Sequence, residues 1–317
     1  MSESNTPPRK TVLISGCSNG GIGSALVETF HERGLHVFAT ARTLSKMSQI
    51  EKLPNVTLLQ LDVLSQSSID AAVEAVTAQT GGKLDYLINN SGQSCIQPAL
   101  ETSIERAREI HDVNFWGTVR VTHAFSPLVI ASKGTIANVC SIAAVLHVAW
   151  GAFYNSSKAA VRSYSETLRV ELAPLGVKVI TVMAGVVGTN IFENHPEANL
   201  SDSSPWKPAE KVIQGQAAGS MTDGAMPRSV FARHVADSVL GGATGMTWVG
   251  KMATTAYWIS GFLPIWMLRR KQVKATGQVL QASTLSDLED VVWMLDIDYR
   301  YMDGSLWNVL TGDEVPT

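Results

Sequence analysis

Short apolar runs alternate with longer amphipathic stretches along the chain before residue 187. The runs have the length of buried strands, and the stretches place apolar residues at helical spacing. We predict strands at residues 11–15, 35–40, 56–61, 84–89, 135–139 and 177–183. We predict helices at residues 22–33, 67–79, 103–125 and 154–173. Strands that alternate with helices imply an α/β fold, a doubly wound parallel sheet covered on both faces.

This regular pattern ends near residue 187. Residues 194–230 hold four prolines among small and polar residues, which favours a mobile loop with short helices. Residues 252–268 are apolar and aromatic, and a basic triplet follows them at 269–271. An acidic, amphipathic tail begins near residue 275. The pattern divides the chain into a leader (1–9), a main domain (10–250) and a C-terminal hydrophobic extension (251–317).

Composition and charge narrow the class of protein. The net charge of −3 argues against a nucleic-acid partner, and 45% hydrophobic residues allow a large core. Three cysteines at wide spacing favour free thiols in a reducing compartment over disulfides or a metal site. The polar leader has two prolines and no apolar core of a signal peptide, so we expect a disordered leader and a protein kept on the cytosolic side.

A glycine-rich turn, SGCSNGGIG at residues 15–23, lies between the first predicted strand and the first helix. Glycines let the backbone approach a pyrophosphate closely, and the helix N-terminus presents unpaired N–H groups to that anion. A tight turn without a ligand is the alternative. The context of strand, turn and helix favours a dinucleotide cofactor.

The end of the second strand carries Arg42 and no acidic residue. Enzymes that bind a ribose 2′-hydroxyl usually place an acid here, whereas a guanidinium suits a 2′-phosphate. The sequence therefore favours NADP(H) over NAD(H). The alternative is that Arg42 is a solvated loop residue.

Several further motifs lie at fixed spacing, and together they resemble the short-chain dehydrogenase/reductase family over residues 10–250. They are the glycine turn, Asp62 in LDV, the NNSG segment at 89–92, Asn114 in VNFWG, Ser141 at a strand end, and Tyr154 and Lys158 in YNSSK. Within the family, the turn and the strand end ATAR are most similar to fungal NADPH-dependent 1-acyldihydroxyacetone-phosphate reductases. Related reductases serve fungal secondary metabolism.

The resemblance implies a Rossmann fold and hydride transfer between a nicotinamide and a carbonyl or alcohol. Tyr154 and Lys158 are four residues apart and share a helix face. A tyrosine ordinarily ionises at about pH 10. We expect the Lys158 ammonium and the nicotinamide ring to lower the pKa of Tyr154, which then passes a proton to the carbonyl oxygen. Ser141 holds the substrate oxygen.

The resemblance assigns the remaining roles. Lys158 also binds the nicotinamide ribose, and Asn114 holds a water that supplies protons to Lys158. Asp62 accepts from the adenine amine, with a helix N-cap as the alternative, and Thr189 meets the carboxamide, with a loop hydrogen bond as the alternative. The predicted cofactor-binding residues are Gly16, Ser18, Gly20, Gly21, Ile22, Gly23, Arg42, Asp62, Val63, Asn90, Lys158, Val187 and Thr189. We leave His147 out of the catalytic set and interpret Cys95 and Cys140 as packing residues.

The sequence departs from the family pattern at three places. The glycine turn has one additional residue, so either Gly20 or Gly21 is its middle glycine. Ala184 and Gly185 replace the usual Pro-Gly, and we expect a looser loop beside the nicotinamide. The stretch beyond about residue 275 has no counterpart in the family pattern.

Residues 252–268 are 17 in number, fewer than the ~20 needed to span a bilayer. Three interpretations stay open: an interfacial membrane anchor over 252–271, a wall or lid of the substrate pocket, and an oligomer contact. The anchor would place the protein at the surface of the endoplasmic reticulum or of lipid droplets. The anchor and the wall both favour an apolar ketone, lipid-like or from secondary metabolism, that is reduced to an alcohol.

A second class of function is a dinucleotide-binding protein that acts as a scaffold or a non-redox cyclase or isomerase. The intact set of Asn114, Ser141, Tyr154 and Lys158 weighs against it. The family resemblance further implies a homodimer or homotetramer.

Overall fold

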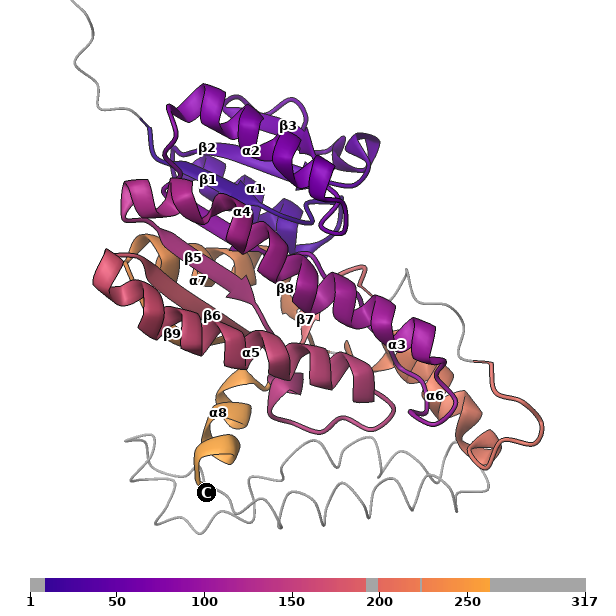
Figure 1. Cartoon of the computed structure of the whole chain (residues 1–317). Helices are drawn as coiled ribbons and strands as arrows, with labels where there is room; N and C mark the ends of the chain where they lie inside the picture. Colours follow the sequence, from indigo (N-terminus) through magenta and orange to yellow (C-terminus); the bar gives the residue numbers. More distant parts are fainter. Residues whose placement is uncertain (1–8, 192–198, 223, 263–317) are drawn as a thin grey trace, which may run out of the picture.

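Seven strands form one parallel sheet in the computed structural model, which describes residues 9–191, 199–222 and 224–262 (Figure 1). The strands are β1 (Thr11–Ile14), β2 (His36–Ala41), β3 (Val56–Gln60), β4 (Tyr86–Asn89), β5 (Thr135–Val139), β6 (Lys178–Ala184) and β9 (Gly245–Val249). Their order is β3-β2-β1-β4-β5-β6-β9, and every neighbouring pair is parallel. The predicted doubly wound α/β fold is confirmed.

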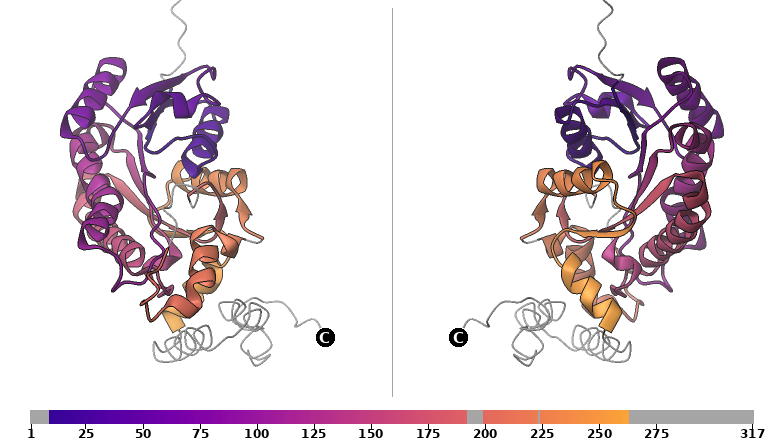
Figure 2. Two further views of the ribbon diagram at one scale, coloured as in Figure 1. Left: turned by 90° about the vertical axis from the view of Figure 1, so that its right-hand side faces the viewer. Right: turned by 90° about the vertical axis from the view of Figure 1, so that its left-hand side faces the viewer.

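Helices cover both faces of this sheet (Figure 2). The described helices are α1 (Ile22–Glu32), α2 (Gln66–Thr80), α3 (Ile104–His111), α4 (Gly117–Ser132), α5 (Ala152–Leu172), α6 (Glu210–Ala217), α7 (Arg228–Leu240) and α8 (Ala253–Phe262). Helices α1 and α7 pack together on one face, and α2, α4 and α5 form the layer on the other.

Alternation along the strands builds two apolar cores. Val12 and Ile14 of β1 belong to the core beneath α1 and α7, together with the fully buried Phe30 and Phe231. Leu13 points to the opposite face and belongs to the core beneath α2 and α4. Neighbouring strand residues face opposite sides of a sheet, so a strand covered on both faces must be apolar throughout.

The predicted helix over 103–125 is three consecutive segments. Helix α3 leads into a π-helical turn at Asp112–Trp116, and α4 then continues to Ser132. A π turn adds one residue per turn and is common at functional sites. The apolar periodicity indicated one helix here because it does not reveal where the hydrogen bonding shifts by one residue.

The described part of the segment after residue 187 holds the short helices predicted there, but also elements that were not predicted. Helix α7 covers the sheet, β9 extends it beside β6, and the short strands β7 (Val187–Gly188) and β8 (Met226–Pro227) pair with one another. Strand β9 reads GMTWV and is only partly buried, so it lacks the continuous apolar run that marked the other strands.

The C-terminal extension is described only as far as α8. Its Ala253, Ala256 and Ile259 pack against Ile142 and Leu146, beside the end of β5. No helix in the described residues is long and apolar enough to cross a membrane. The basic triplet at 269–271, the acidic tail and leader residues 1–8 lie outside the described residues, and the predicted domain boundary at residue 250 stays a prediction.

Buried amides and hydroxyls tie the centre of the sheet to its helices. Asn89 Nδ2 donates to Asn138 Oδ1 and to Thr122 Oγ1, each at 2.8 Å. Asn138 Nδ2 in turn donates to Ser165 Oγ at 2.8 Å. This chain runs from α4 through β4 and β5 to α5, the helix that carries Tyr154.

We expect Asn138→Ala to lower the free energy of unfolding by roughly 2–4 kcal/mol, because it leaves buried donors and acceptors without partners and opens a small cavity. Urea unfolding followed by tryptophan fluorescence measures this change. The exposed Gln49→Ala serves as the control. If Asn138→Ala lowered the free energy of unfolding as little as the control does, the buried hydrogen-bond chain would not stabilise the fold.

Candidate active site

A cleft of about 870 Å³ opens where the strands end. Its floor comes from the segments that follow β1, β4, β5 and β6, represented by Gly16, Asn90, Ser141 and Gly185. This edge includes the point between β1 and β4 where the strand order reverses. Open α/β sheets bind their ligands at such switch points.

Close backbone packing explains the glycines after β1. Gly16 has a φ of +73°, and a Cβ on Gly23 would lie 2.3 Å from the Gly16 carbonyl oxygen. Gly20 also has a positive φ, +77°. Gly21 is the N-cap of α1 and lines the cleft, whereas Gly20 and Gly23 do not. The structure therefore assigns Gly21 to the cleft, and Gly20 and Gly23 to the shape of the turn.

The N-terminus of α1 faces the cleft without a side-chain cap. Gly21 supplies no capping group, and Ile22 lines the cleft beside it together with Ser18. Asn90 stabilises the turn, because its Nδ2 donates to the carbonyls of Ser15 at 2.9 Å and Gly16 at 3.0 Å. Uncapped N–H groups and the positive end of the helix dipole form an anion site.

The far end of the cleft lies beside β2 and β3. Asp62 and Val63 line it, and Asp62 Oδ1 accepts from the Leu64 amide at 3.0 Å. The N-cap of α2 is Ser65, whose hydroxyl accepts from the Ser68 amide, so the N-cap alternative for Asp62 is wrong.

Two exposed cations, Arg42 and Lys46, also line this end of the cleft. Lys46 lies in the 3-10 turn Leu44–Met47, and the sequence analysis did not select it. The sequence could have indicated Lys46 through its position four residues after Arg42, a second cation near the same strand end.

The loop after β6 is firmly held, which contradicts the expected loosening at Ala184 and Gly185. The Gly185 amide donates to the Val249 carbonyl at 2.8 Å, and the Val186 amide donates to the Lys251 carbonyl at 2.9 Å. A Cβ on Gly185 would lie 2.1 Å from the Lys251 carbonyl oxygen. Pairing with the segment after β9 replaces the stiffness of a proline. Val187 and Thr189 line the cleft beyond this loop.

Tyr154 and Lys158 lie one turn apart on α5, on the wall opposite the glycine turn. The Lys158 Nζ lies 5.9 Å from the centroid of the Tyr154 ring and donates to the Val139 carbonyl at 3.0 Å. The Ser141 side chain accepts from the Ala143 amide at 3.1 Å, and it lies close enough to the Tyr154 hydroxyl to lower the pKa of that group. The structure thus brings Tyr154, Lys158 and Ser141 together.

Asn114 lies behind this wall and does not line the cleft. Its Oδ1 accepts from the Gln93 amide at 2.7 Å, and its Nδ2 donates to the Gln93 carbonyl and to Ser157 Oγ, each at 3.0 Å. The π turn places Asn114 here, and its amide clamps the backbone of the cleft-lining Gln93. The predicted role of Asn114 in holding a water stays a prediction.

Comparisons with known proteins agree with this geometry. The family model described as short chain dehydrogenase matches residues 10–200. Short-chain dehydrogenase ptmH of Penicillium ochrochloron is 46% identical over 269 residues, which cover 85% of this chain and 98% of that protein. The chain belongs to the short-chain dehydrogenase family. It is therefore an oxidoreductase, as the sequence analysis predicted.

Two further relatives of this short-chain dehydrogenase carry more detailed names. NADPH-dependent 1-acyldihydroxyacetone phosphate reductase of Schizosaccharomyces pombe is 44% identical over 209 residues, 64% of this chain and 70% of that protein. A short chain dehydrogenase from Burkholderia cenocepacia, solved in complex with NADP, is 26% identical with a TM-score of 0.64. The match covers 84% of this chain and 98% of that one.

Burial governs the ionisation of Tyr154 and Lys158 in this short-chain dehydrogenase. It raises the pKa of Tyr154 to about 12, and the hydrogen bond with Ser141 offsets only part of this. Burial also lowers the pKa of the Lys158 ammonium. Burial thus opposes a lower pKa for Tyr154 in the protein alone, and the expected joint effect of Lys158 and the nicotinamide ring stays a prediction.

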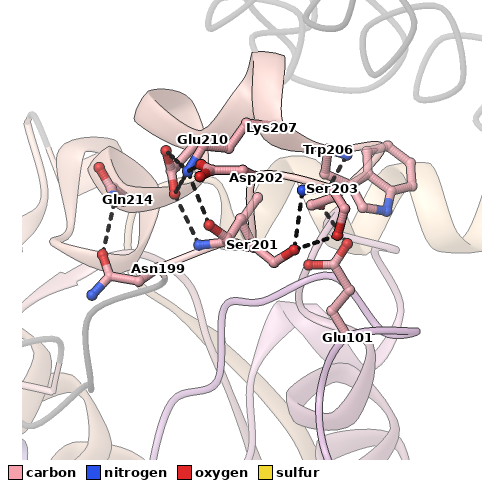
Figure 3. A network of polar contacts seen from close by, with 11 residues as sticks. Glu101, Asn199, Ser201, Asp202, Ser203, Trp206, Lys207, Glu210 and Gln214 are labelled. Carbon is pink, nitrogen blue, oxygen red and sulfur yellow. Dashed lines mark hydrogen bonds and ion pairs between the residues drawn. The ribbon is translucent and has the colours of Figure 1, made fainter.

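A polar network and an apolar cluster hold the substrate wall that carries α6 (Figure 3). Ser204 Oγ donates to a carboxylate oxygen of Glu101 on the facing segment, and Lys207 Nζ donates to Glu210 at 3.1 Å. Ile96 and Ile213 lie in the cluster beneath, with Trp150 packed against it. The described part of residues 199–222 is therefore packed against the main domain.

The other residues singled out from the sequence play no part in the cleft's polar chemistry. His147 is exposed and does not line the cleft. Cys17, Cys95 and Cys140 are buried, and burial raises the pKa of each thiol. A buried neutral thiol packs as a small apolar group, as predicted for Cys95 and Cys140.

We expect Tyr154 to stay protonated well beyond pH 10, where an ordinary tyrosine ionises. The tyrosinate absorbance of the protein purified without nucleotide, minus that of Tyr154→Phe, should stay flat through about pH 10. It should rise only as the pH approaches about 12. Circular dichroism at each pH confirms that the protein is folded. A step at or below pH 10 would contradict the effect of burial.

Proposed function

We propose that this chain is an NADPH-dependent reductase that converts a ketone of an apolar substrate to an alcohol, with Tyr154 as the proton donor. One observation supports this most strongly: Tyr154, Ser141 and Lys158 line the same cleft as the glycine turn, and the Ser141 hydroxyl lies close enough to Tyr154 to affect its pKa. That arrangement sets a proton donor and a second hydroxyl beside a dinucleotide site.

The residues fit NADP(H). The uncapped N-terminus of α1 at Gly21 suits the pyrophosphate. Gly16 has no side chain that would keep the pyrophosphate away from the backbone, and a Cβ there would crowd Ser91. Arg42 and Lys46 offer two exposed cations to a 2′-phosphate. The relatives support this choice, since one is named NADPH-dependent and one was solved in complex with NADP.

Bound NADPH would supply the hydride, and the protein supplies the proton and the geometry. Tyr154 carries its proton at neutral pH, since its pKa lies at about 12, so the hydroxyl can donate to a carbonyl oxygen. Ser141 donates a second hydrogen bond to that oxygen. Lys158 is held against the Val139 carbonyl, where it can bind the nicotinamide ribose and stabilise the phenolate that forms.

The cleft walls favour an apolar substrate. Ile96, Ile142, Leu146, Val148 and Met252 all line the cleft. Helix α8 packs on the wall that carries Ile142, so its described residues support the pocket-wall interpretation of the extension. The name of the Schizosaccharomyces pombe relative, which acts on an acylated ketone, supports a lipid-like substrate.

The remaining alternatives have less support. The membrane anchor over 252–271 and the dimer or tetramer stay hypotheses, because residues 263–317 lie outside the described residues. The scaffold or non-redox cyclase is less favoured, since Ser141, Tyr154 and Lys158 form one site and Asn114 clamps its neighbour Gln93.

We expect Tyr154→Phe to lower kcat for ketone reduction by roughly 100-fold to 10,000-fold, because it removes the proton donor. Loss of NADPH absorbance with methyl nonyl ketone as the probe measures the rate. Tyr257→Phe, an exposed tyrosine on α8, is the matched control. Undiminished turnover by Tyr154→Phe would rule out the proton-donor role.

We expect the double variant Arg42→Ala, Lys46→Ala to raise KM for NADPH by roughly 100-fold or more while raising KM for NADH far less, since each lost charge-assisted hydrogen bond contributes about 1.5–3 kcal/mol. Lys52→Ala, exposed and outside the cleft, is the control. Equal changes in KM for the two cofactors would show that these cations do not recognise the 2′-phosphate.

A further inference from the structure

Arg106 is a cation that lines the cleft at a distance from the residues proposed to bind the cofactor. Arg106 of α3 is a lining residue, and its side chain is 24% exposed. Helix α3 lies at the opposite end of the molecule from β2 and β3, and Arg42 and Asp62 lie just after these two strands (Figure 1). Arg106 therefore belongs to the substrate end of the cleft.

The guanidinium of Arg106 has more N–H donors than the surrounding protein has acceptors for them. Its Nη1 donates to Glu109 at 2.9 Å and makes a long contact of 3.4 Å with Gln93 Oε1. Its Nε is buried without a hydrogen-bond partner. Among the described residues, no acceptor bonds the second Nη. Buried polar groups are nearly always paired, so a guanidinium with a buried, unpaired Nε at a cleft indicates a further partner that the protein itself does not supply.

The ion pair with Glu109 does not account for this placement. The Glu109 side chain is 62% exposed and lies one turn away on the same helix. Such exposed pairs stabilise a protein little. A purely structural pair would also leave the arginine on the outer face of α3, whereas Arg106 reaches the cleft.

The position of Arg106 is coupled to the catalytic wall. Gln93, which contacts Arg106, has both backbone polar groups clamped by the buried Asn114 amide. Asn114 also binds Ser157, which lies three residues after Tyr154 on α5. The guanidinium is thus held at a defined place relative to the reacting end of the substrate.

We propose that Arg106 is a specificity-determining residue that hydrogen-bonds a second oxygen acceptor of the substrate, apart from the ketone that is reduced. The inference rests on the proposed reductase function. The substrate is then an apolar ketone with one further carbonyl or carboxylate oxygen. A guanidinium binds either oxygen, and more strongly when the oxygen is ionised.

Three probes of equal chain length test this. Methyl nonyl ketone has one oxygen, octanoylacetone adds a second carbonyl, and nonanoylacetate adds a carboxylate. We expect the wild-type enzyme to prefer one of the two-oxygen probes over methyl nonyl ketone by roughly tenfold or more in kcat/KM. The preferred probe identifies the acceptor as neutral or ionised.

The variants assign the preference to Arg106. Arg106→Met should reduce the preference for the two-oxygen probe over methyl nonyl ketone to about onefold. The kcat/KM for methyl nonyl ketone itself should change less than about twofold. Arg106→Lys should restore part of a preference for nonanoylacetate, because it keeps the charge. Arg108→Met, exposed on the same helix and outside the cleft, is the matched control and should keep the preference.

Two results would overturn the inference. One is a wild-type enzyme that treats all three probes alike, and the other is an Arg106→Met variant that loses activity equally for all three. If Arg106→Met does not fold, Arg106→Lys and Arg106→Gln take its place.

A binding measurement separates this inference from the proposed function. Quenching of tryptophan fluorescence in Tyr154→Phe gives Kd for each probe without turnover. If the wild-type enzyme reduces none of the probes, the proposed function fails in this form. The inference then stands if a two-oxygen probe binds more tightly and Arg106→Met removes the difference, and it falls if all three bind alike.

Discussion

The close approach of the turn after β1 to the segment after β4 is the constraint on which the site depends. Asn90 binds the carbonyls of Ser15 and Gly16, and a side chain at Gly23 would collide with the Gly16 carbonyl. This contact brings the N-terminus of α1 to the floor of the cleft with its N–H groups uncapped. The anion site thus follows from backbone packing and not from a charged side chain.

Burial decides the chemistry on the opposite wall. The same packing that orients Tyr154 and Lys158 on α5 removes water from both, so the pKa of the hydroxyl rises and that of the ammonium falls. Each group is pushed towards its neutral form, because neither keeps the hydration that a charge needs. A hydroxyl that holds its proton suits donation to a carbonyl, as the proposed reductase function requires.

The substrate end of the cleft is assembled from parts that are distant in the sequence. Helix α6 is held by Lys207 and by the contact of Ser204 with Glu101, and α8 packs on the wall after β5. Apolar residues such as Ile96, Ile142 and Leu146 line this end together with polar ones, and Arg106 adds a cation to them. Buried amides of Asn89 and Asn138 give the sheet beneath a fixed geometry.

The sequence by itself determined the parallel sheet, the glycine turn and the identity of Tyr154, Lys158 and Ser141. These features are local or periodic: fully buried strands are continuous apolar runs, and Tyr154 and Lys158 share a face at a spacing of one helical turn. It did not reveal β9, a short, partly buried strand that becomes one only by pairing with β6.

Only the tertiary structure decided which polar groups meet and how they ionise. It placed Asn114 behind Gln93 through the π turn, brought Lys46 beside Arg42, and turned Arg106 towards the cleft. It also showed that burial raises the pKa of Tyr154 in the protein alone. The physical reason is that burial and hydrogen-bond partners depend on segments that are far apart in the chain, whereas apolar periodicity records only which face of each element is covered.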